Sequence, residues 1–410
     1  MTDGLLTDYF YYCQKFLKIL LYKKIKRWKM KYRKFGKTGF EISVLGFGAM
    51  RLPMLKNAHN DRDVDEKEAI KMLRYAIDSG INYIDSAYIY HGGLSEVIVG
   101  KALKNGYRKK VKIATKFPVG FAKDENDFDK ILDEQLKRFD TDIIDFYLFH
   151  GIGAQGWEEV KEKNFLKKME DAKKQGKIGH IGFSFHDNFV IFKKILDEYD
   201  KWEFCQVQFN YMDINNQATE KGLFYAADKG IGILIMEPLL GGRLARPPKD
   251  VKEIINSYKK SFSPAYWAFK FLFNYKEISC VLSGMSTMEQ LIENLKIADE
   301  AEIDNLDKDD KELINKIREQ FKKRAVIPCT GCKYCMNCPS GVNIPLMFSL
   351  YNEGIIYDDM GAPQFTYGRW VNENEKANLC TECKKCEEKC PQKIKISEWM
   401  PVIHKTLSKT

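Results

Sequence analysis

The chain has 410 residues, of which 44% are hydrophobic and 30% are charged. This composition is typical of a soluble globular protein with two or three domains or one enlarged barrel, and it excludes a disordered chain, a collagen-like fibre and a multi-span membrane protein. Residues 1–37 carry eleven Lys and Arg against two acidic residues, which accounts for the whole net charge of +9. The rest of the chain is neutral, so it lacks the electrostatic footprint of a nucleic-acid-binding protein.

Residues 1–29 form a basic extension. Apolar side chains recur at helical spacing over residues 5–22, which predicts an amphipathic helix. It has no run of about 20 apolar residues and should not span a bilayer. We favour an appended helix, or an upstream start codon with the natural start at Met30, over contact of residues 5–22 with an anionic membrane surface. No cleavable signal peptide is visible, so we expect a cytoplasmic protein.

The region from residue 41 to 325 alternates between short apolar runs and amphipathic stretches. The amphipathic stretches predict helices over Glu66–Ser79, Phe128–Phe139, Trp157–Gln175 and Met288–Asp299, and Asp304–Lys323 predicts a charged helix leading to the cysteines. Eight apolar runs predict buried strands: Val44–Gly48, Ile81–Ile84, Val111–Lys116, Ile143–Phe149, Ile178–Phe183, Phe204–Phe209, Ile231–Met236 and Ile278–Leu282. Eight strands with intervening helices favour an α/β fold of the closed, parallel (β/α)8 TIM-barrel type over a doubly wound sheet.

Four polar residues follow or end successive predicted strands. They are Asp85, Tyr90, Lys116 and His150. Barrels of this type carry their chemistry at the C-terminal ends of the strands. A nearby ammonium lowers the pKa of a phenol, a carboxylate holds the ammonium, and an imidazole donates to a carbonyl oxygen. Each residue alone is more often structural, but the set predicts a site that protonates a carbonyl oxygen as hydride reaches its carbon.

A glycine motif follows the fourth predicted strand. Gly151, Gly153 and Gly156 match the G-x-G-x-x-G pattern of dinucleotide-binding folds. The motif does not lie in a first βα unit, and His150 adjoins it. We therefore interpret these glycines as a flexible rim of the active site.

These motifs resemble those of the aldo/keto reductase family. The likeness is carried by Asp85-Ser-Ala-Tyr-Ile-Tyr90, by Lys116 in Ala-Thr-Lys-Phe and by His150 in Tyr-Leu-Phe-His. The segment from Phe35 to Gly48, which begins soon after Met30, is also similar to that family. The resemblance covers residues 30–325. It implies an eight-stranded α/β barrel, carbonyl reduction linked to NADPH, and Asp85, Tyr90, Lys116 and His150 as catalytic residues.

The same resemblance implies a nucleotide site. Departures from the family pattern are Phe185 in place of Asn, Met236 in place of an aromatic, and Gly284 and Gln290 in place of basic residues that often hold the 2′-phosphate. The expected cofactor is NADP(H), with NAD(H) as the alternative. The cofactor-binding residues that the resemblance implies are Ser184, Gln206, Leu239, Gly241, Gly242, Gly284, Ser286, Gln290 and Asn294.

Eight of the eleven cysteines form two groups near the C-terminus. The second group, followed by Pro391, has the C-x2-C-x2-C-x3-C-P spacing of bacterial ferredoxins, in which each run lends its fourth cysteine to the other cluster. Two zinc ions are the less favoured alternative, because structural zinc sites use close pairs, usually with His. Residues 326–410 resemble a ferredoxin-like domain with two 4Fe–4S clusters. We expect one cluster on Cys329, Cys332, Cys335 and Cys390, and the other on Cys380, Cys383, Cys386 and Cys338.

Two functions follow from these features. The first is an NAD(P)H-dependent oxidoreductase that reduces a small-molecule aldehyde or ketone, or catalyses the reverse, with clusters for electron transfer or structure. Hydride moves two electrons and each cluster carries one, so the clusters suggest a ferredoxin or flavoprotein partner. The alternative, motivated by Phe185 and Met236, is a redox-sensing or electron-shuttling protein that binds nucleotide without carbonyl turnover.

Overall fold

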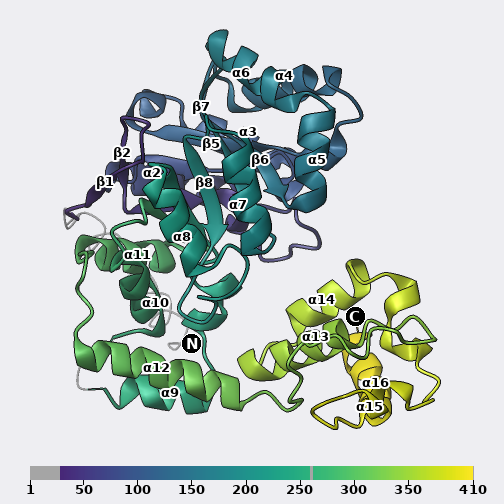
Figure 1. The fold of residues 1–410 in the computed structure, drawn as a ribbon. Coiled ribbons are helices and arrows are strands. Elements are labelled where there is room, and N and C mark those ends of the chain that lie inside the picture. The colour runs from purple at the N-terminus through teal and green to yellow at the C-terminus, as the bar shows by residue number, and fades with distance from the viewer. Residues whose placement is uncertain (1–27, 259–261, 410) are drawn as a thin grey trace, which may run out of the picture. The chain divides into compact units, whose positions relative to one another are not determined.

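The computed structural model describes residues 28–258 and 262–409 (Figure 1). The predicted helix of residues 5–22 lies outside the described residues. Within the described ranges, no helix has the length and apolar character needed to cross a membrane. The chain divides into two compact units: one holds residues up to Gln206 with Tyr225–Leu234 and Ser279–Ala301, and the other holds Val207–Phe224, Ile235–Ile278 and the residues from Glu302 onward. The predicted domain bounds at 29/30 and 325/326 stay predictions.

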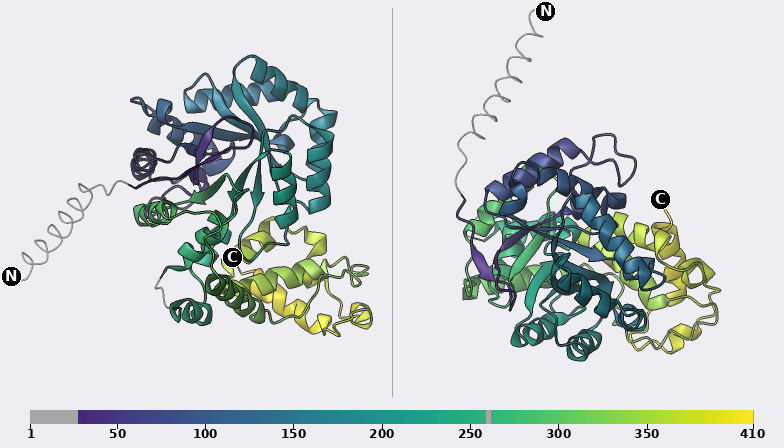
Figure 2. Two further views of the ribbon diagram at one scale, coloured as in Figure 1. Left: turned by 60° about the vertical axis from the view of Figure 1, so that its left-hand side comes forward. Right: turned by 90° about the horizontal axis from the view of Figure 1, so that it is seen from above.

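Eight strands close into a barrel in the order β10-β3-β4-β5-β6-β7-β8-β9. The predicted (β/α)8 barrel is therefore confirmed, with helices outside the strands (Figures 1 and 2). The pairs from β10 round to β7 are parallel. Strands buried on both faces are expected to be continuous apolar runs, which is why the sequence revealed them. The strands are β3 (Leu45–Gly48), β4 (Tyr83–Asp85), β5 (Lys112–Phe117), β6 (Ile144–Ile152), β7 (Ile178–Phe185), β8 (Phe204–Gln208), β9 (Gly232–Met236) and β10 (Cys280–Gly284).

The helices between the strands begin at side-chain caps in several places. Asp65, Thr287 and Asp307 each accept a backbone N–H in the first turn of a helix. The predicted helix over 157–175 is wrong in one respect: it is two helices, because Asn164 adopts a left-handed conformation with φ 54°. The helices in chain order are α2 (Glu66–Asp78), α3 (Leu94–Ala102), α4 (Asn126–Phe139), α5 (Ala154–Glu162), α6 (Phe165–Lys174), α7 (Phe189–Glu198), α8 (Thr219–Asp228), α9 (Lys249–Asn256), α10 (Pro264–Phe273), α11 (Met288–Asp299) and α12 (Lys308–Lys323).

A short antiparallel hairpin precedes the barrel and was not predicted. It consists of β1 (Tyr32–Lys34) and β2 (Glu41–Ser43). The Phe35 ring packs 5.1 Å from that of Phe146 and 5.4 Å from that of Phe204, between ring centroids. Gly36 has φ 51°, and a Cβ there would lie 2.2 Å from the Gly232 nitrogen, so only glycine fits. The hairpin packs against the N-terminal parts of strands and leaves their C-terminal ends for chemistry.

The C-terminal segment has a core of its own. Its helices are α13 (Ile344–Tyr357), α14 (Gly361–Arg369), α15 (Lys385–Glu388) and α16 (Ile396–Leu407). Met347, Phe348 and Met400 are buried at the centre of this core, and six of the eight clustered cysteines pack against it. The core thus gives the cysteine loops a fixed base.

Candidate functional site

The four predicted catalytic residues lie on neighbouring elements at the C-terminal ends of the strands. Asp85 is the last residue of β4, Lys116 lies near the end of β5 and His150 lies near the end of β6. Tyr90 begins a 3-10 turn, η2 (Tyr90–Gly93), in the connection from β4 to α3. Because β4, β5 and β6 are adjacent in the barrel, residues far apart in sequence meet at one rim.

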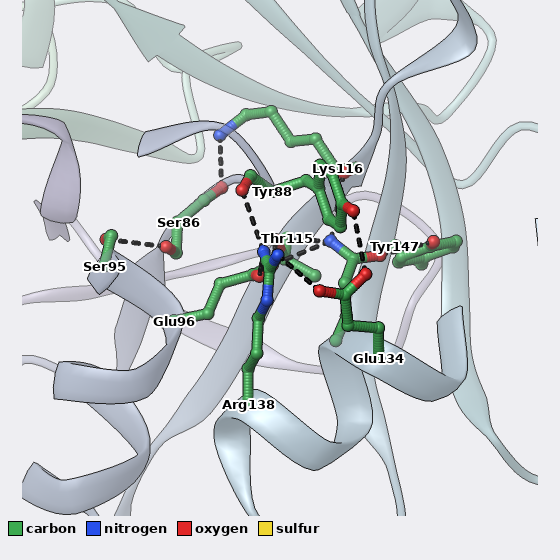
Figure 3. A network of polar contacts seen from close by, with 10 residues as sticks. Ser86, Tyr88, Ser95, Glu96, Thr115, Lys116, Glu134, Arg138 and Tyr147 are labelled. Atoms are coloured by element: carbon green, nitrogen blue, oxygen red, sulfur yellow. Dashed lines mark hydrogen bonds and ion pairs between the residues drawn. The ribbon is translucent and has the colours of Figure 1, made fainter. Parts of the chain in front are cut away.

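The Lys116 side chain connects the set. It is 1% exposed, and its Nζ donates to Asp85 Oδ1 at 2.6 Å and to the Ser86 carbonyl at 2.6 Å. The bond to Ser86 is visible in Figure 3. The same nitrogen lies 3.3 Å from the Tyr90 hydroxyl and 4.8 Å from the centroid of its ring. The His150 ring lies 5.9 Å from the Tyr90 ring, nearly perpendicular to it. The structure therefore brings all four together.

Burial and neighbouring groups together decide the charges of Lys116 and His150. Burial alone would lower the pKa of Lys116, but the Asp85 carboxylate and the Tyr90 hydroxyl outweigh it and raise that pKa. Lys116 is therefore an ammonium. Burial, assisted by the positive charge of Lys116, lowers the pKa of His150 to about 3. His150 is therefore a neutral imidazole, which can donate one N–H bond to a substrate oxygen.

Two predicted nucleotide residues lie on the strands that follow. Ser184, on β7, is buried, and its Oγ accepts the Gly151 N–H at 2.7 Å. Gln206, on β8, is also buried. Phe185 packs against the rings of Phe183 and Phe192, so it belongs to the core and does not occupy the position of a polar carboxamide ligand. Ser184 thus fastens β7 to the residue that follows His150.

The glycine motif has no dinucleotide-fold context. Gly151, with φ 60°, lies within β6, and Gly153 precedes α5. Both belong to a barrel strand and its rim. The interpretation of a rim segment agrees with this geometry.

The end of β10 and the start of α11 form a second group. The Ser286 N–H donates to Gln290 Oε1 at 2.8 Å, whereas Asn294 is buried and donates to Ser283 Oγ at 3.0 Å. Gly284 ends β10, and a Cβ there would lie 3.2–3.4 Å from three carbons of the Arg51 side chain.

Arg51 itself was missed by sequence reasoning. It ends the 3-10 turn η1 (Ala49–Arg51) after β3, and its carbonyl accepts the Ser286 hydroxyl at 3.0 Å. Its side chain is exposed, and no salt bridge to it occurs among the described residues. The available signal was the parallel pairing of β3 with β10, in which Gly48 faces Gly284.

The predicted cofactor-binding residues Leu239, Gly241 and Gly242 lie in the 3-10 segment η5 (Leu240–Ala245) and at the residue before it. Gly241 and Gly242 have φ of 69° and 98°, and the Gly242 N–H donates within the turn to the Leu239 carbonyl at 2.9 Å. The next residue, Arg243, is mostly buried and forms ion pairs with Glu353 and Asp359. Sequence reasoning missed Arg243, because its partners are more than 100 residues away.

The eight clustered cysteines line two separate cavities. Cys329, Cys332, Cys335 and Cys390 line one of them, together with Pro345 and Phe348. The other is lined by Cys338, Cys380, Cys383 and Cys386, together with Ile344 and Met400. In each cavity the fourth cysteine comes from the other run of the sequence.

The four thiols around each cavity suit an iron–sulfur cluster. Four cysteines around a cavity fit a cubane of four irons, each of which takes one thiolate. The Gly331 N–H also points at Cys329 Sγ at 3.5 Å, a contact of the kind that tunes cluster potential.

Comparisons with known proteins agree with both parts of the chain. Residues 44–319 match the model of the aldo/keto reductase family, and residues 328–395 match that of a 4Fe-4S dicluster domain. The chain is 28% identical over 313 residues to L-galactose dehydrogenase of Arabidopsis thaliana. The aligned region covers 72% of this chain and 96% of that protein.

Solved structures show the same fold. The aldo-keto reductase AKR11C1 from Bacillus halodurans in its holo form is 24% identical, with a TM-score of 0.59 over 70% of this chain and 96% of that one. An aldo-keto reductase from Klebsiella pneumoniae in complex with NADPH is 19% identical, with a TM-score of 0.58 over 70% and 95% of the two chains. The barrel, its strand-end residues and the family match together identify the chain as an oxidoreductase of the aldo/keto reductase family, joined to a 4Fe-4S dicluster domain.

Proposed function

We propose that the protein reduces an aldehyde or ketone with a nicotinamide cofactor, or catalyses the reverse, with Tyr90 as the acid. The observation that carries this proposal is the 3.3 Å separation between Lys116 Nζ and the Tyr90 hydroxyl. An ammonium at that distance stabilises the phenolate that remains after Tyr90 gives up its proton. Asp85 holds the ammonium at 2.6 Å.

Tyr90 and His150 have different roles at the carbonyl of the substrate. When bound, the nicotinamide supplies a hydride, which carries two electrons. The π electrons of the carbonyl move onto its oxygen, which takes the proton from the Tyr90 hydroxyl. His150 is neutral, so it orients the carbonyl oxygen by donating an N–H bond and does not compete with Tyr90 as an acid.

NADP(H) is the proposed cofactor, with NAD(H) as the alternative. The residues around β10 and α11 fit a phosphate-bearing nucleotide, because the aliphatic part of the exposed Arg51 side chain lies beside Gly284 and the Arg51 carbonyl accepts the Ser286 hydroxyl shortly before α11. Guanidinium groups and helix N-termini both attract phosphate. This position restores a basic group to a segment in which Gly284 and Gln290 carry no charge. Ser184, Gln206, Leu239, Gly241, Gly242, Gly284, Ser286, Gln290 and Asn294 stay the proposed contacts.

We also propose two 4Fe–4S clusters, one in each cysteine-lined cavity. Cys329, Cys332 and Cys335 would share one with Cys390, and the other would be held by Cys380, Cys383, Cys386 and Cys338. A cluster transfers one electron at a time, whereas hydride transfer moves two, so the clusters point to a ferredoxin or flavoprotein as a one-electron partner. A purely structural role is the alternative for the clusters.

A second function is favoured by one observation. Phe185 packs in the core, so the polar side chain that usually holds the carboxamide is missing next to Ser184. A redox sensor or electron shuttle could bind nucleotide in this way without turning over a carbonyl.

The test is anaerobic purification, followed by iron and sulfide analysis and by oxidation of NADPH and NADH against a panel of aldehydes and ketones. We expect about eight irons per chain, as two 4Fe–4S clusters require, and turnover of at least one carbonyl. Nucleotide binding without turnover of any member of a broad panel would favour the sensor or shuttle and contradict the reductase.

A further inference from the structure

Glu96 is a fully buried carboxylate beneath the loop that carries Tyr90. It lies in the first turn of α3, and its hydrogen bonds go to Thr115, Gln135 and Arg138, which are not among the residues of the proposed reaction. Burial raises its pKa, although its hydrogen bonds oppose this effect. Burying a carboxylate is strongly unfavourable unless hydrogen-bond donors surround it, so the donors around Glu96 are expected to be specific.

Three side chains from two other elements donate to Glu96. Its Oε1 accepts from Thr115 Oγ1 of β5 at 2.5 Å and from Gln135 Nε2 of α4 at 2.7 Å. Its Oε2 accepts from Arg138 Nη1, also of α4, at 2.9 Å. Figure 3 shows Glu96, Thr115 and Arg138 converging from α3, β5 and α4.

One arm of this network ends on the backbone of Lys116. Gln135 Nε2 lies 3.1 Å from the Lys116 carbonyl oxygen, and Gln135 Oε1 accepts from the Tyr147 hydroxyl at 2.6 Å. Thr115, which donates to Glu96, immediately precedes Lys116. Glu96 therefore holds two neighbouring residues of β5. It binds the Thr115 side chain directly, and it binds the Lys116 carbonyl through Gln135.

The other arm ends on the loop of Tyr90. Arg138 Nη1 donates to the Tyr88 carbonyl at 2.9 Å, and its guanidinium carbon lies 4.2 Å from the centroid of the Tyr88 ring. A Cβ on Gly93, the last residue of the turn that Tyr90 begins, would lie 3.0 Å from the guanidinium carbon. Gly93 has φ 91°, so both the close approach and the backbone require glycine.

From this geometry we propose that Glu96 is a positioning residue, which sets the separation of Lys116 Nζ and the Tyr90 hydroxyl by holding Gln135 and Arg138 against the two backbone segments. This inference rests on the proposed function of Tyr90 and Lys116. The alternative is a buried polar cluster that only stabilises the barrel. The positioning role predicts that a change at Glu96 shifts the titration of Tyr90, whereas a purely stabilising cluster predicts no such shift.

The test is Glu96→Gln in the full chain with its clusters, alongside Arg138→Met. Because a misplacement of about 1 Å caused by a mutation outside the reacting groups can cost about 10²-fold in rate, we expect kcat to fall at least tenfold in each variant, with KM for carbonyl and NADPH within twofold. The alkaline limb of the kcat–pH profile should move to higher pH, since a looser loop weakens the influence of the ammonium on Tyr90. The double variant should be no worse than the poorer single one, because both residues act in one network.

Asp145→Asn is the matched control. Asp145 is a buried carboxylate of β6 that accepts from Lys112 Nζ at 2.9 Å, from Arg108 Nη2 at 2.8 Å and from the Ile113 N–H at 3.0 Å, but it contacts neither Lys116 nor the Tyr90 loop. It should lower the melting temperature and leave kcat and its pH profile unchanged.

A second readout separates failure of this inference from failure of the proposed function. Ultraviolet titration of tyrosine, taken as the difference between each chain and its Tyr90→Phe counterpart, reports Tyr90 without turnover. A rise in the Tyr90 midpoint in Glu96→Gln supports the inference even if no carbonyl is reduced. An unchanged midpoint and pH profile, with only a lower melting temperature, would overturn it.

Discussion

The ammonium nitrogen of Lys116 lies 3.3 Å from the Tyr90 hydroxyl and 2.6 Å from Asp85 Oδ1. One buried cation is therefore shared between a carboxylate that fixes it and a phenol that it can activate. These three residues come from β4, from the loop after it and from β5. Their meeting depends on adjacent strands of a closed barrel ending at the same rim.

Tyr90→Phe should abolish carbonyl reduction, because among the described residues the hydroxyl that hydrogen-bonds Lys116 Nζ is that of Tyr90. General acid catalysis contributes about 10²- to 10⁴-fold, so we expect kcat to fall by at least 10². Cluster absorbance and NADPH binding should be unchanged. Tyr107→Phe, a half-buried position whose hydroxyl donates to Asp78, should retain full activity. Full activity in Tyr90→Phe would refute the assignment of the acid.

Lys116→Met should be strongly destabilising, because it leaves the Asp85 carboxylate buried without a counter-charge. Losing one partner of a buried pair costs about 3–5 kcal/mol. The double variant Lys116→Met/Asp85→Asn should recover part of that stability but no activity. Denaturant unfolding of the wild type, of Lys116→Met, of Asp85→Asn and of the double variant measures the effect. Strict additivity of the two changes would show that the pair is not coupled.

His150 should make the protein less stable as the pH falls below neutrality. Its folded-state pKa of about 3 lies below the ordinary value of about 6.5, so the unfolded chain takes up the proton first. Between pH 7.5 and pH 5.5 this costs about 1 kcal/mol of stability. His150→Gln should lack this loss, which is measured as a smaller drop in unfolding free energy over that range. An equal drop in both proteins would contradict a His150 that is neutral in the folded chain.

Cysteine pairs test which thiols share a cluster. Cys335 and Cys390 line the same cavity. The double variant Cys335→Ser/Cys390→Ser should therefore lose about as much iron as either single variant. Cys390→Ser combined with Cys386→Ser should lose both clusters, because Cys386 lines the other cavity. Cys205→Ala, at a buried barrel position, should keep all its iron. If the Cys335→Ser/Cys390→Ser variant lost both clusters, the proposal that each cluster takes its fourth cysteine from the other run would be rejected.

Arg51→Ala should weaken binding of NADPH and spare NADH. A charge-assisted hydrogen bond is worth about 1.5–3 kcal/mol, so the Kd for NADPH should rise at least tenfold, as measured by fluorescence titration. Lys56→Ala, an exposed position in the following loop, serves as control. A parallel loss of both cofactors would assign Arg51 to general binding and not to the 2′-phosphate.

The sequence alone determined the barrel and predicted which residues meet at its rim. Eight strands buried on both faces leave continuous apolar runs, and a barrel puts the ends of such runs at one rim, so Asp85, Tyr90, Lys116 and His150 could be grouped without coordinates. The cysteine spacing likewise predicted which thiols share each cavity. These signals are local or follow from the symmetry of the fold.

Only the tertiary structure decided what surrounds those residues. The hairpin of β1 and β2 is too short to leave a periodic pattern, and Phe35 acts through contacts with distant strands. Nothing in the sequence distinguishes four charged residues of these surroundings from ordinary charged positions: Glu96, Arg138, Arg51 and Arg243. Each acquires its role from one or two partners that the folded chain brings together, and pairwise contacts at long sequence separation leave no periodicity in a single sequence.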